Sequence, residues 1–221
     1  MFEQLQIRIK RGSRVTSPDD NWTASDKLYC GARLTVGFGE IFDWNDTDLL
    51  PLQKLVAFYH DLGQSVRSSA PTAFQYSFPY RNGSVQLHWT IQPHAQLNFT
   101  ISYRQGNRER EVLSKPVDIP AIILWMDTTY ETILTQVTEI APPAISLMVG
   151  ELFSPGPHAG FRFGPGQKVR TVLSTQVRQL HIGYILHRIR QDDDNNNYYQ
   201  ILVNGKPLKR RYLEEELEPI T

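Results

Sequence analysis

The feature that most constrains the fold is a regular alternation of apolar and polar residues in the first half of the chain. Successive side chains of a strand point to opposite faces, so each alternating segment has one apolar face. Strands of this kind pair into an antiparallel sheet with one face covered and the other exposed to water. The segments that predict such strands are 2–9, with an irregularity near Gln4, then 28–38, 85–91 and 97–103.

Two stretches with helical spacing can cover this sheet. In the first, Asp48 is the predicted cap and Pro51 lies in the first turn. The second follows Pro120 and ends at Pro142 and Pro143, because proline cannot continue a helix. This order of elements predicts the α+β class, an antiparallel sheet with two covering helices. The apolar stripes are Leu52, Leu55, Val56, Tyr59, Leu62 and Val66 in the first helix, and Ile123, Met126, Tyr130, Ile133, Leu134 and Val137 in the second.

A segment rich in glycine and proline interrupts both patterns at residues 150–166. It contains eight Gly or Pro in seventeen positions, a density that disfavours helix and strand alike. Phe153, Phe161 and Phe163 lie within it, and because exposed Phe is unfavourable we expect the segment to pack against a neighbouring domain. The predicted organisation is an α+β domain at 1–149, a connection at 150–166 and a small domain at 167–221.

The C-terminal segment, residues 168–221, consists of short predicted strands separated by turns. Its strand rhythm is carried by Gly183-Tyr184-Ile185, Tyr199-Gln200-Ile201-Leu202-Val203, Asn204-Gly205 and Glu216-Leu217-Glu218-Pro219-Ile220. This order resembles the SH3-like small β-barrels of KOW, Tudor and photosystem I PsaE-type domains. The resemblance implies a small barrel at 167–221 that binds a peptide, RNA, DNA or a partner subunit.

Two polar segments within this region have their own predictions. Asn204-Gly205 predicts a type I′ hairpin turn, since both central residues of that turn need a positive φ. The run from Asp192 to Asn197 predicts an exposed loop, and it lacks the alternating ligands, glycine and final glutamate of an EF-hand calcium site.

The overall charge is balanced. Lys+Arg and Asp+Glu both number 23, so bulk attraction to nucleic acid or to an anionic membrane is not expected. The N-terminal residues have no secretory signal pattern, and the longest apolar run, 119–126, is too short to span a bilayer. These features predict a cytoplasmic protein without a membrane partner.

Cys30 is the single cysteine of the chain, which excludes an intramolecular disulfide. Alternation places it among Leu28, Ala32 and Leu34, so we predict a buried and unreactive thiol. The histidines have no metal-ligand spacing and the glycines no dinucleotide fingerprint, so neither a metal nor a cofactor is predicted.

An acidic and aromatic segment before the first predicted helix is the leading candidate for contact with a partner protein. We expect part of it to be exposed, and the alternative is a hydrophobic staple packed over the start of the helix. The favoured hypothesis is a non-enzymatic protein-binding or regulatory protein, of the immunity or inhibitor type in a bacterial system. The candidate partner-binding residues are Phe42, Asp43, Trp44, Asp46 and Asp48.

The alternative hypothesis is a nucleic-acid-associated protein that uses a basic strip of the C-terminal barrel. Residues 167–221 carry nine Lys+Arg against seven Asp+Glu, an excess too small to favour nucleic acid. A solvated hairpin whose charges are offset by Glu214, Glu215 and Glu216 is the simpler interpretation. The strip consists of Lys206, Lys209, Arg210, Arg211, Tyr199 and Tyr212.

A third hypothesis is an enzyme of unfamiliar type. It requires several titratable groups to converge in one pocket. The sequence contains no familiar catalytic motif, so no catalytic residue is assigned. The simplest convergent set would be His60, Asp61, His88 and Glu40.

Overall fold

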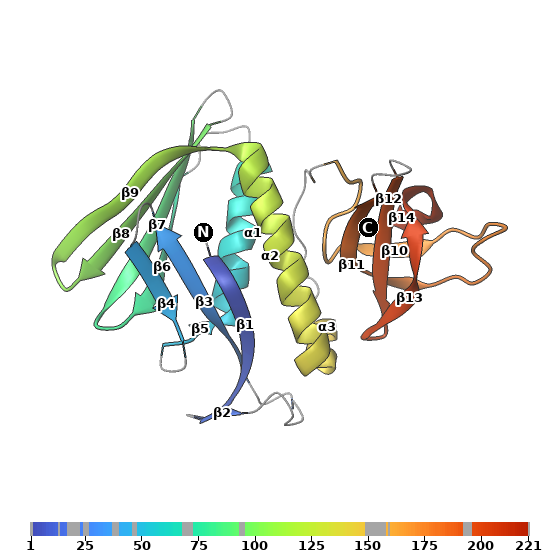
Figure 1. The fold of residues 1–221 in the computed structure, drawn as a ribbon, viewed down its shortest axis with the longest axis horizontal. Helices are drawn as coiled ribbons and strands as arrows, with labels where there is room; N and C mark the ends of the chain where they lie inside the picture. Colours follow the sequence, from blue (N-terminus) through green and yellow to red (C-terminus); the bar gives the residue numbers. More distant parts are fainter. Residues whose placement is uncertain are drawn as a thin grey trace. The chain divides into compact units, whose positions relative to one another are not determined.

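The chain has an α+β structure built mainly of antiparallel sheets, shown as a computed structural model in Figure 1. Its internal contacts divide it into two compact units, Met1–Ile122 (unit 1) and Ile123–Thr221 (unit 2). The structure describes residues 2–12, 14–16, 23, 27–36, 40–45, 48–67, 73–92, 96–148, 158, 160–191 and 196–220.

Unit 1 consists of strands from two antiparallel sheets and helix α1 (Leu52–Arg67). Its strands are β1 (Phe2–Arg11), β2 (Arg14–Thr16), β3 (Lys27–Val36), β4 (Glu40–Trp44), β5 (Leu50–Pro51), β6 (Ala73–Tyr80), β7 (Gly83–Gln92), β8 (Gln96–Gln105) and β9 (Arg108–Asp118). The first sheet has the order β2-β1-β3-β4, with β5 also paired to β3, and the second has the order β6-β7-β8-β9.

The predicted strands are present, but they belong to two sheets rather than one. Those predicted at 2–9 and 28–38 correspond to β1 and β3, and those at 85–91 and 97–103 to β7 and β8. The last two residues of the 28–38 prediction lie outside the described part of the chain. The alternation of apolar and polar residues did not predict strand β9, because β9 is a mostly exposed edge strand without a continuous apolar face.

The irregularity predicted near Gln4 is confirmed. The pairing of β1 with β3 shifts register between Glu3 and Gln6, and Gln4 has a φ of 52°. This β-bulge returns Leu5, like Phe2, to the buried face of the sheet.

Helix α1 begins at Leu52, three residues later than a cap at Asp48 predicts. Pro51 is not in its first turn but pairs with Tyr29 of β3 as the last residue of β5. Asp48 lies in a turn before that strand, where its N–H donates to the Asn45 carbonyl at 2.9 Å. The predicted apolar stripe of α1 faces the core of unit 1. Its buried members are Leu52, Leu55, Val56, Tyr59 and Leu62.

Aromatic side chains form much of the core of unit 1 and join α1 to both sheets. The ring of Phe58 on α1 lies 6.0 Å from Phe2 of the first sheet, and 5.6 Å and 5.4 Å from Phe78 and Trp89 of the second. Trp44 adds a polar link between the sheets, since its indole N–H donates to the Pro79 carbonyl at 2.6 Å.

Cys30 is fully buried in this core, as predicted. Burial raises the pKa of its thiol to about 12, and the backbone of Gln6 offsets this only in part. The thiolate is the reactive form, so the side chain behaves as a small apolar residue.

Unit 2 contains most of helix α2 (Ile119–Ile140), helix α3 (Pro142–Met148) and a five-stranded antiparallel sheet. The strands are β10 (Lys168–Thr171), β11 (Ile182–Gln191), β12 (Asn196–Val203), β13 (Lys206–Leu213) and β14 (Leu217–Pro219). Their order is β13-β12-β11-β10-β14, and a 3-10 turn at Glu214–Glu216 precedes the last strand.

The end of the glycine- and proline-rich segment is part of the sheet's core. Phe163 is buried and Phe161 packs against the same cluster. The Gly166 N–H donates to the Ile185 carbonyl at 2.8 Å, which pairs this segment with β11. The remainder of the core consists of Val169, Val177, Ile185, Tyr199, Ile201, Tyr212 and Leu217.

The tight turn predicted at Asn204 and Gly205 joins β12 to β13. Both residues have positive φ, 51° and 73°, as a type I′ turn requires. The predicted exposed loop lies largely outside the described residues, although Asn196 and Asn197 begin β12.

We expect Trp44→Ala to reduce the free energy of unfolding by about 3–5 kcal/mol, because it removes a buried aromatic ring. Trp44→Phe should cost about 1–3 kcal/mol, since it keeps a ring but leaves the Pro79 carbonyl without its donor. Urea unfolding followed by circular dichroism measures both. Equal losses for the two variants would show that the ring contributes nothing beyond the hydrogen bond, and no loss for Trp44→Phe would show that the hydrogen bond contributes nothing.

Candidate functional site

A cluster of buried charges joins helix α2 to strand β11 within unit 2. The Arg188 side chain is only 5% exposed and lies between two carboxylates of the helix. It donates to Asp127 Oδ2 at 2.5 Å and to Glu131 Oε1 at 2.6 Å. Its guanidinium carbon lies 4.8 Å from the centre of the Phe161 ring. Arg188 therefore bonds to the helix on one side and packs on the chain before β10 on the other.

Two histidines border the same cluster. His158 Nδ1 lies 3.5 Å from Asp127 Oδ1, and the His158 ring packs so closely on Gly164 that a side chain there would overlap it. His187 Nε2 lies 3.2 Å from the Thr135 hydroxyl, one helical turn beyond Glu131. Burial raises the pKa of Glu131, although its hydrogen bond from Arg188 acts in the opposite direction. These contacts fix α2 against β11 along more than two turns.

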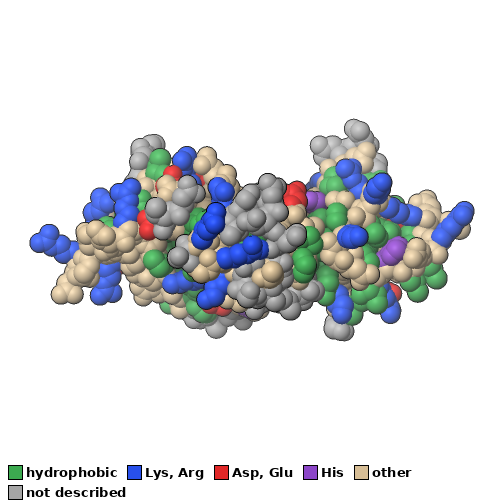
Figure 2. Space-filling model, turned by 90° about the horizontal axis from the view of Figure 1, so that it is seen from below, with side chains coloured by type: hydrophobic (Ala, Val, Ile, Leu, Met, Phe, Trp, Pro, Cys, Tyr) green, Lys and Arg blue, Asp and Glu red, His purple; other side chains and the backbone are tan. Residues whose placement is uncertain are grey.

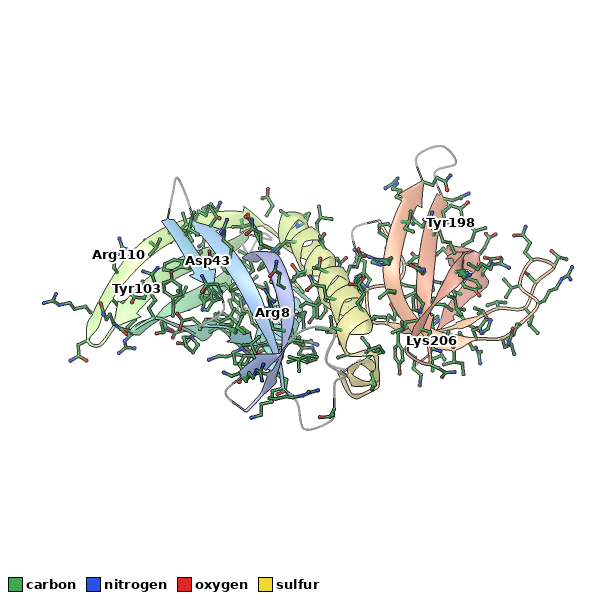
Figure 3. The ribbon with its side chains drawn as sticks, turned by 60° about the horizontal axis from the view of Figure 1, so that its bottom comes forward. Arg8, Asp43, Tyr103, Arg110, Tyr198 and Lys206 are labelled. Atoms are coloured by element: carbon green, nitrogen blue, oxygen red, sulfur yellow. The ribbon has the colours of Figure 1, made fainter. Side chains whose placement is uncertain are left out.

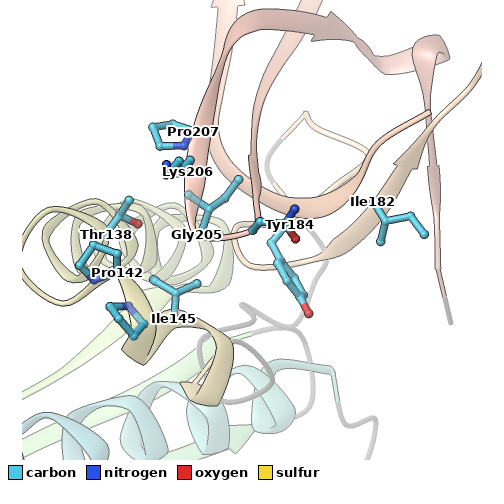
Figure 4. Close-up of a pocket in the computed structure, with 11 residues that line it drawn as sticks. Thr138, Pro142, Ile145, Ile182, Tyr184, Gly205, Lys206 and Pro207 are labelled. Atoms are coloured by element: carbon cyan, nitrogen blue, oxygen red, sulfur yellow. The ribbon is translucent and has the colours of Figure 1, made fainter. Parts of the chain in front are cut away.

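Beyond this cluster, α2, α3 and the sheet enclose an apolar groove with a volume of about 710 Å³. Figure 4 shows the helix residues and the strand residues facing each other across it. The helical wall is Thr138, Pro142, Pro143 and Ile145, and the sheet wall is Ile182, Tyr184, Leu202, Asn204, Gly205, Lys206 and Pro207.

Strand pairing sets the sheet wall. Tyr184 lies opposite Leu202, and Leu202 lies opposite Pro207, so these three side chains share one face across β11, β12 and β13. Gly183 permits the close approach of β12 to β11, since a Cβ there would lie 2.4 Å from the Leu202 carbonyl oxygen. The groove floor is therefore a continuous apolar row.

An exposed apolar loop between β10 and β11 borders the groove at Ile182. Leu173, Leu180 and Ile182 are 56%, 61% and 57% exposed. Thr171 fixes the base of the loop: its hydroxyl donates to the Gln179 carbonyl and accepts from the His181 N–H. The loop thus presents Leu173 and Leu180 to solvent on an ordered base, while its Val177 packs into the core.

Basic side chains accompany this apolar surface. Lys206 lines the groove, and Lys168 lies opposite Tyr184 on the same face of the sheet. Arg170 lies opposite Ile182 but forms an ion pair with Glu218. Figure 2 shows apolar and basic side chains next to one another on the surface of unit 2. The groove therefore suits an apolar ligand that also carries negative charge.

The predicted partner-binding segment is placed differently from the expectation. Phe42 and Trp44 are 3% and 1% exposed and belong to the core of unit 1, so these two rings are not available to a partner. Alternation along β4 turns Asp43 to the other face, where it accepts from Arg33 at 3.1 Å. Asp46 lies outside the described residues, and Asp48 is partly exposed.

The basic strip of the C-terminal sheet, Lys206 to Tyr212 with Tyr199, lacks the exposed aromatic rings that the nucleic-acid hypothesis requires. Tyr199 and Tyr212 are 0% and 3% exposed, since both belong to the core of the sheet. Arg210 pairs with Glu216 at 2.6 Å and lies over the Tyr212 ring. Of the remaining cations, Lys206 lines the groove, and Lys209 and Arg211 are exposed on β13.

Two residues of the enzyme hypothesis, Asp61 and His88, lie on opposite sides of the second sheet and do not face one pocket. Asp61 on α1 accepts a hydrogen bond from Tyr76, whose ring stacks on Trp89. His88 neighbours Trp89 on β7, so its side chain points to the opposite face of the sheet. His60 is partly exposed on α1, and Glu40 begins β4.

Within the described part of the chain, no three His, Cys, Asp or Glu side chains are grouped as a metal site would require. None of the described helices combines the length and the apolar character that a membrane span needs. Comparison with known proteins finds no matching family model, curated protein or solved structure.

We expect Arg188→Met to lower the free energy of unfolding by about 3–5 kcal/mol, because it leaves the buried Asp127 carboxylate without its main counter-ion. The double variant Asp127→Asn with Arg188→Met should recover part of this loss. Urea denaturation followed by circular dichroism gives the values. Arg170→Met, which breaks the exposed pair with Glu218, is the control and should change the midpoint little. A similar small change for Arg188→Met would contradict a structural role of the cluster.

Acid stability should depend on Glu214. Burial alone would raise the pKa of Glu214, but hydrogen bonds from Tyr199, the Arg162 N–H and Asn197 together lower it. Because the folded pKa lies below the unfolded one, the stabilisation is complete above the unfolded pKa and disappears as pH falls through the folded pKa. Glu214→Gln should therefore lose less stability than the wild type between about pH 7 and about pH 3 in urea unfolding. The exposed neighbour Glu215 provides the control, and Glu215→Gln should keep the wild-type acid dependence.

Proposed function

We propose that this protein binds another protein through the apolar surface of unit 2, formed by the groove and the β10–β11 loop. The observation that carries the proposal is the concentration of exposed apolar side chains. Among the described residues, four of the six large exposed apolar side chains, Val172, Leu173, Leu180 and Ile182, fall within eleven positions. Scattered apolar residues are normal on a protein surface, whereas a cluster beside a groove is typical of a docking site.

The proposed occupant is an extended segment of the partner with apolar side chains and flanking acidic groups. The groove volume of about 710 Å³ lies within the usual range of ligand-binding clefts, and its floor is apolar. Lys206 lines the groove, and Lys168 lies opposite the lining residue Tyr184 on the same sheet face. Their positive charge favours a negatively charged partner over a basic one.

The biological role that we propose is regulatory and non-enzymatic, in the cytoplasm, with an immunity or inhibitor type of action. An SH3-like barrel is part of the same proposal. Five antiparallel strands with a 3-10 turn before the last support it, together with the residues Gly183-Tyr184-Ile185 and Asn204-Gly205.

A display library of random dodecapeptides selected on the immobilised full-length chain tests this function. We expect enriched peptides to combine apolar residues with Asp or Glu, and Leu173→Asp with Leu180→Asp to abolish their binding in fluorescence anisotropy. Leu124→Asp is the matched control, because Leu124 and Leu173 are equally exposed, at 56%. Leu124 lies far from the groove: it precedes the lining residue Thr138 by 14 residues on α2, about 21 Å along the helix. It should leave binding unchanged.

Two results would contradict the proposal. One is a selection that enriches no common sequence; the other is a peptide whose binding is unaffected by the Leu173 and Leu180 substitutions. Circular dichroism of each variant must match the wild type, since both leucines are exposed and their replacement should not disturb the core.

A further inference from the structure

The outer face of the first sheet of unit 1 carries a row of basic side chains. On β1, Ile7 and Ile9 point into the core, so Arg8 and Lys10 point outward. On β3, Cys30 points inward and Tyr29 outward. Figure 3 shows Arg8 on β1 and Asp43 on β4 of the same sheet.

Strand register brings these side chains together. Arg8 lies opposite Tyr29, and Lys10 lies opposite Lys27. Like charges at directly opposed positions destabilise a sheet, so the Lys10–Lys27 pair opposes folding rather than supporting it. Lys10 Nζ also lies 4.8 Å from the centre of the Tyr29 ring. Arg8 donates to the neutral Gln6 side chain at 2.9 Å, and within the described part of the chain it forms no ion pair with a carboxylate.

The positive charge continues to the end of the hairpin. Arg11 lies opposite Arg14 across a turn where Gly12 has a φ of 59°. Among the described residues of β1, β2 and β3, the one carboxylate is Glu3, which lies opposite Arg33 near the other end of β1. Asp43 of β4 also lies opposite Arg33 and forms an ion pair with it. Asp19, Asp20 and Asp26 of the intervening segment lie outside the described residues.

We propose that this face, defined by Arg8, Lys10, Lys27 and Tyr29, binds single-stranded nucleic acid. Side chains two residues apart on one face of a strand are about 6.6–6.8 Å apart, and adjacent strands are about 4.8 Å apart. Such an array of cations matches a ligand with repeating negative charges, and a phosphate backbone is one. Binding would also relieve the repulsion between Lys10 and Lys27, a stabilisation that a neutral ligand cannot provide.

The tyrosine favours a single strand over a duplex or an acidic protein. Unpaired bases stack on aromatic rings placed among cations, whereas bases within a duplex are stacked on one another. Tyr29 is partly exposed, in contrast to the buried Tyr199 and Tyr212 of the barrel strip. This inference concerns unit 1 and another class of ligand, so it stands independently of the protein-binding surface of unit 2.

Fluorescence anisotropy with a labelled twenty-nucleotide single strand, titrated at several salt concentrations, tests the proposal. We expect binding that weakens as salt increases. Lys10→Gln with Lys27→Gln should reduce the slope of log K against log salt by about 1.4, since each lost phosphate contact on a single strand contributes about 0.7. Tyr29→Leu should weaken binding by about fivefold or more through loss of stacking. Circular dichroism establishes that each variant is folded.

The double variant Lys209→Gln with Arg211→Gln is the matched control, because it also removes two positive charges, but from exposed positions of unit 2. It should leave the affinity within error of the wild type. The proposal is overturned by absence of binding at low salt, by binding that depends on Lys209 and Arg211 instead, or by equal competition from polyglutamate of the same charge. A duplex that binds as tightly as the single strand, with no effect of Tyr29→Leu, would also overturn it.

Discussion

The interaction on which unit 2 depends is the pair of hydrogen bonds that Arg188 donates, one to Asp127 and one to Glu131. A buried guanidinium is expensive to desolvate, and here it is matched by two carboxylates and by the Phe161 ring. The contact links a helix to a strand nearly sixty residues further along the chain. Both walls of the groove are then held in place, since one belongs to the helices and the other to the sheet. The arrangement of the groove at the surface of this unit therefore depends on a buried cluster of charges.

Unit 1 relies on aromatic packing instead. Phe58 contacts both sheets, and Trp44 links them by a hydrogen bond as well as by its ring. The inward residues of each strand are committed to this core, so the outward residues determine what the surface can bind. On β1 and β3 those outward residues include Arg8, Lys10 and Lys27. A chain with no net charge therefore still presents a locally positive face.

The two proposed surfaces differ in physical character. In unit 2, the side chains of Leu173 and Leu180 are exposed to water, and Lys206 adds positive charge to the lining of the groove. In unit 1, positive charges are concentrated around a single tyrosine. Salt should weaken binding to the second surface much more than to the first, because apolar burial is largely insensitive to ionic strength and phosphate contacts are not.

The sequence alone determined features that depend on near neighbours. Alternation placed Cys30 inside and revealed the irregularity at Gln4, and Asn204-Gly205 specified its turn through the positive φ that both residues adopt. Alternation also assigns each side chain to one of two faces, but it does not say which face an isolated aromatic segment buries. Trp44 and Tyr199, expected at binding surfaces, are core residues for this reason.

Only the tertiary structure decided features that depend on distant pairing. The division of the strands into two sheets, the attachment of α2 to β11 and the opposition of Lys10 to Lys27 each join residues from separate parts of the chain. The position of α2 is an example. The sequence pattern places this helix wholly in the first domain, whereas the contacts of the folded chain place its residues from Ile123 onward in unit 2. Local patterns specify a strand or helix and its apolar face, while packing of the whole chain selects the elements that lie next to it. Both candidate surfaces are formed by such neighbouring elements, so only the tertiary structure reveals them.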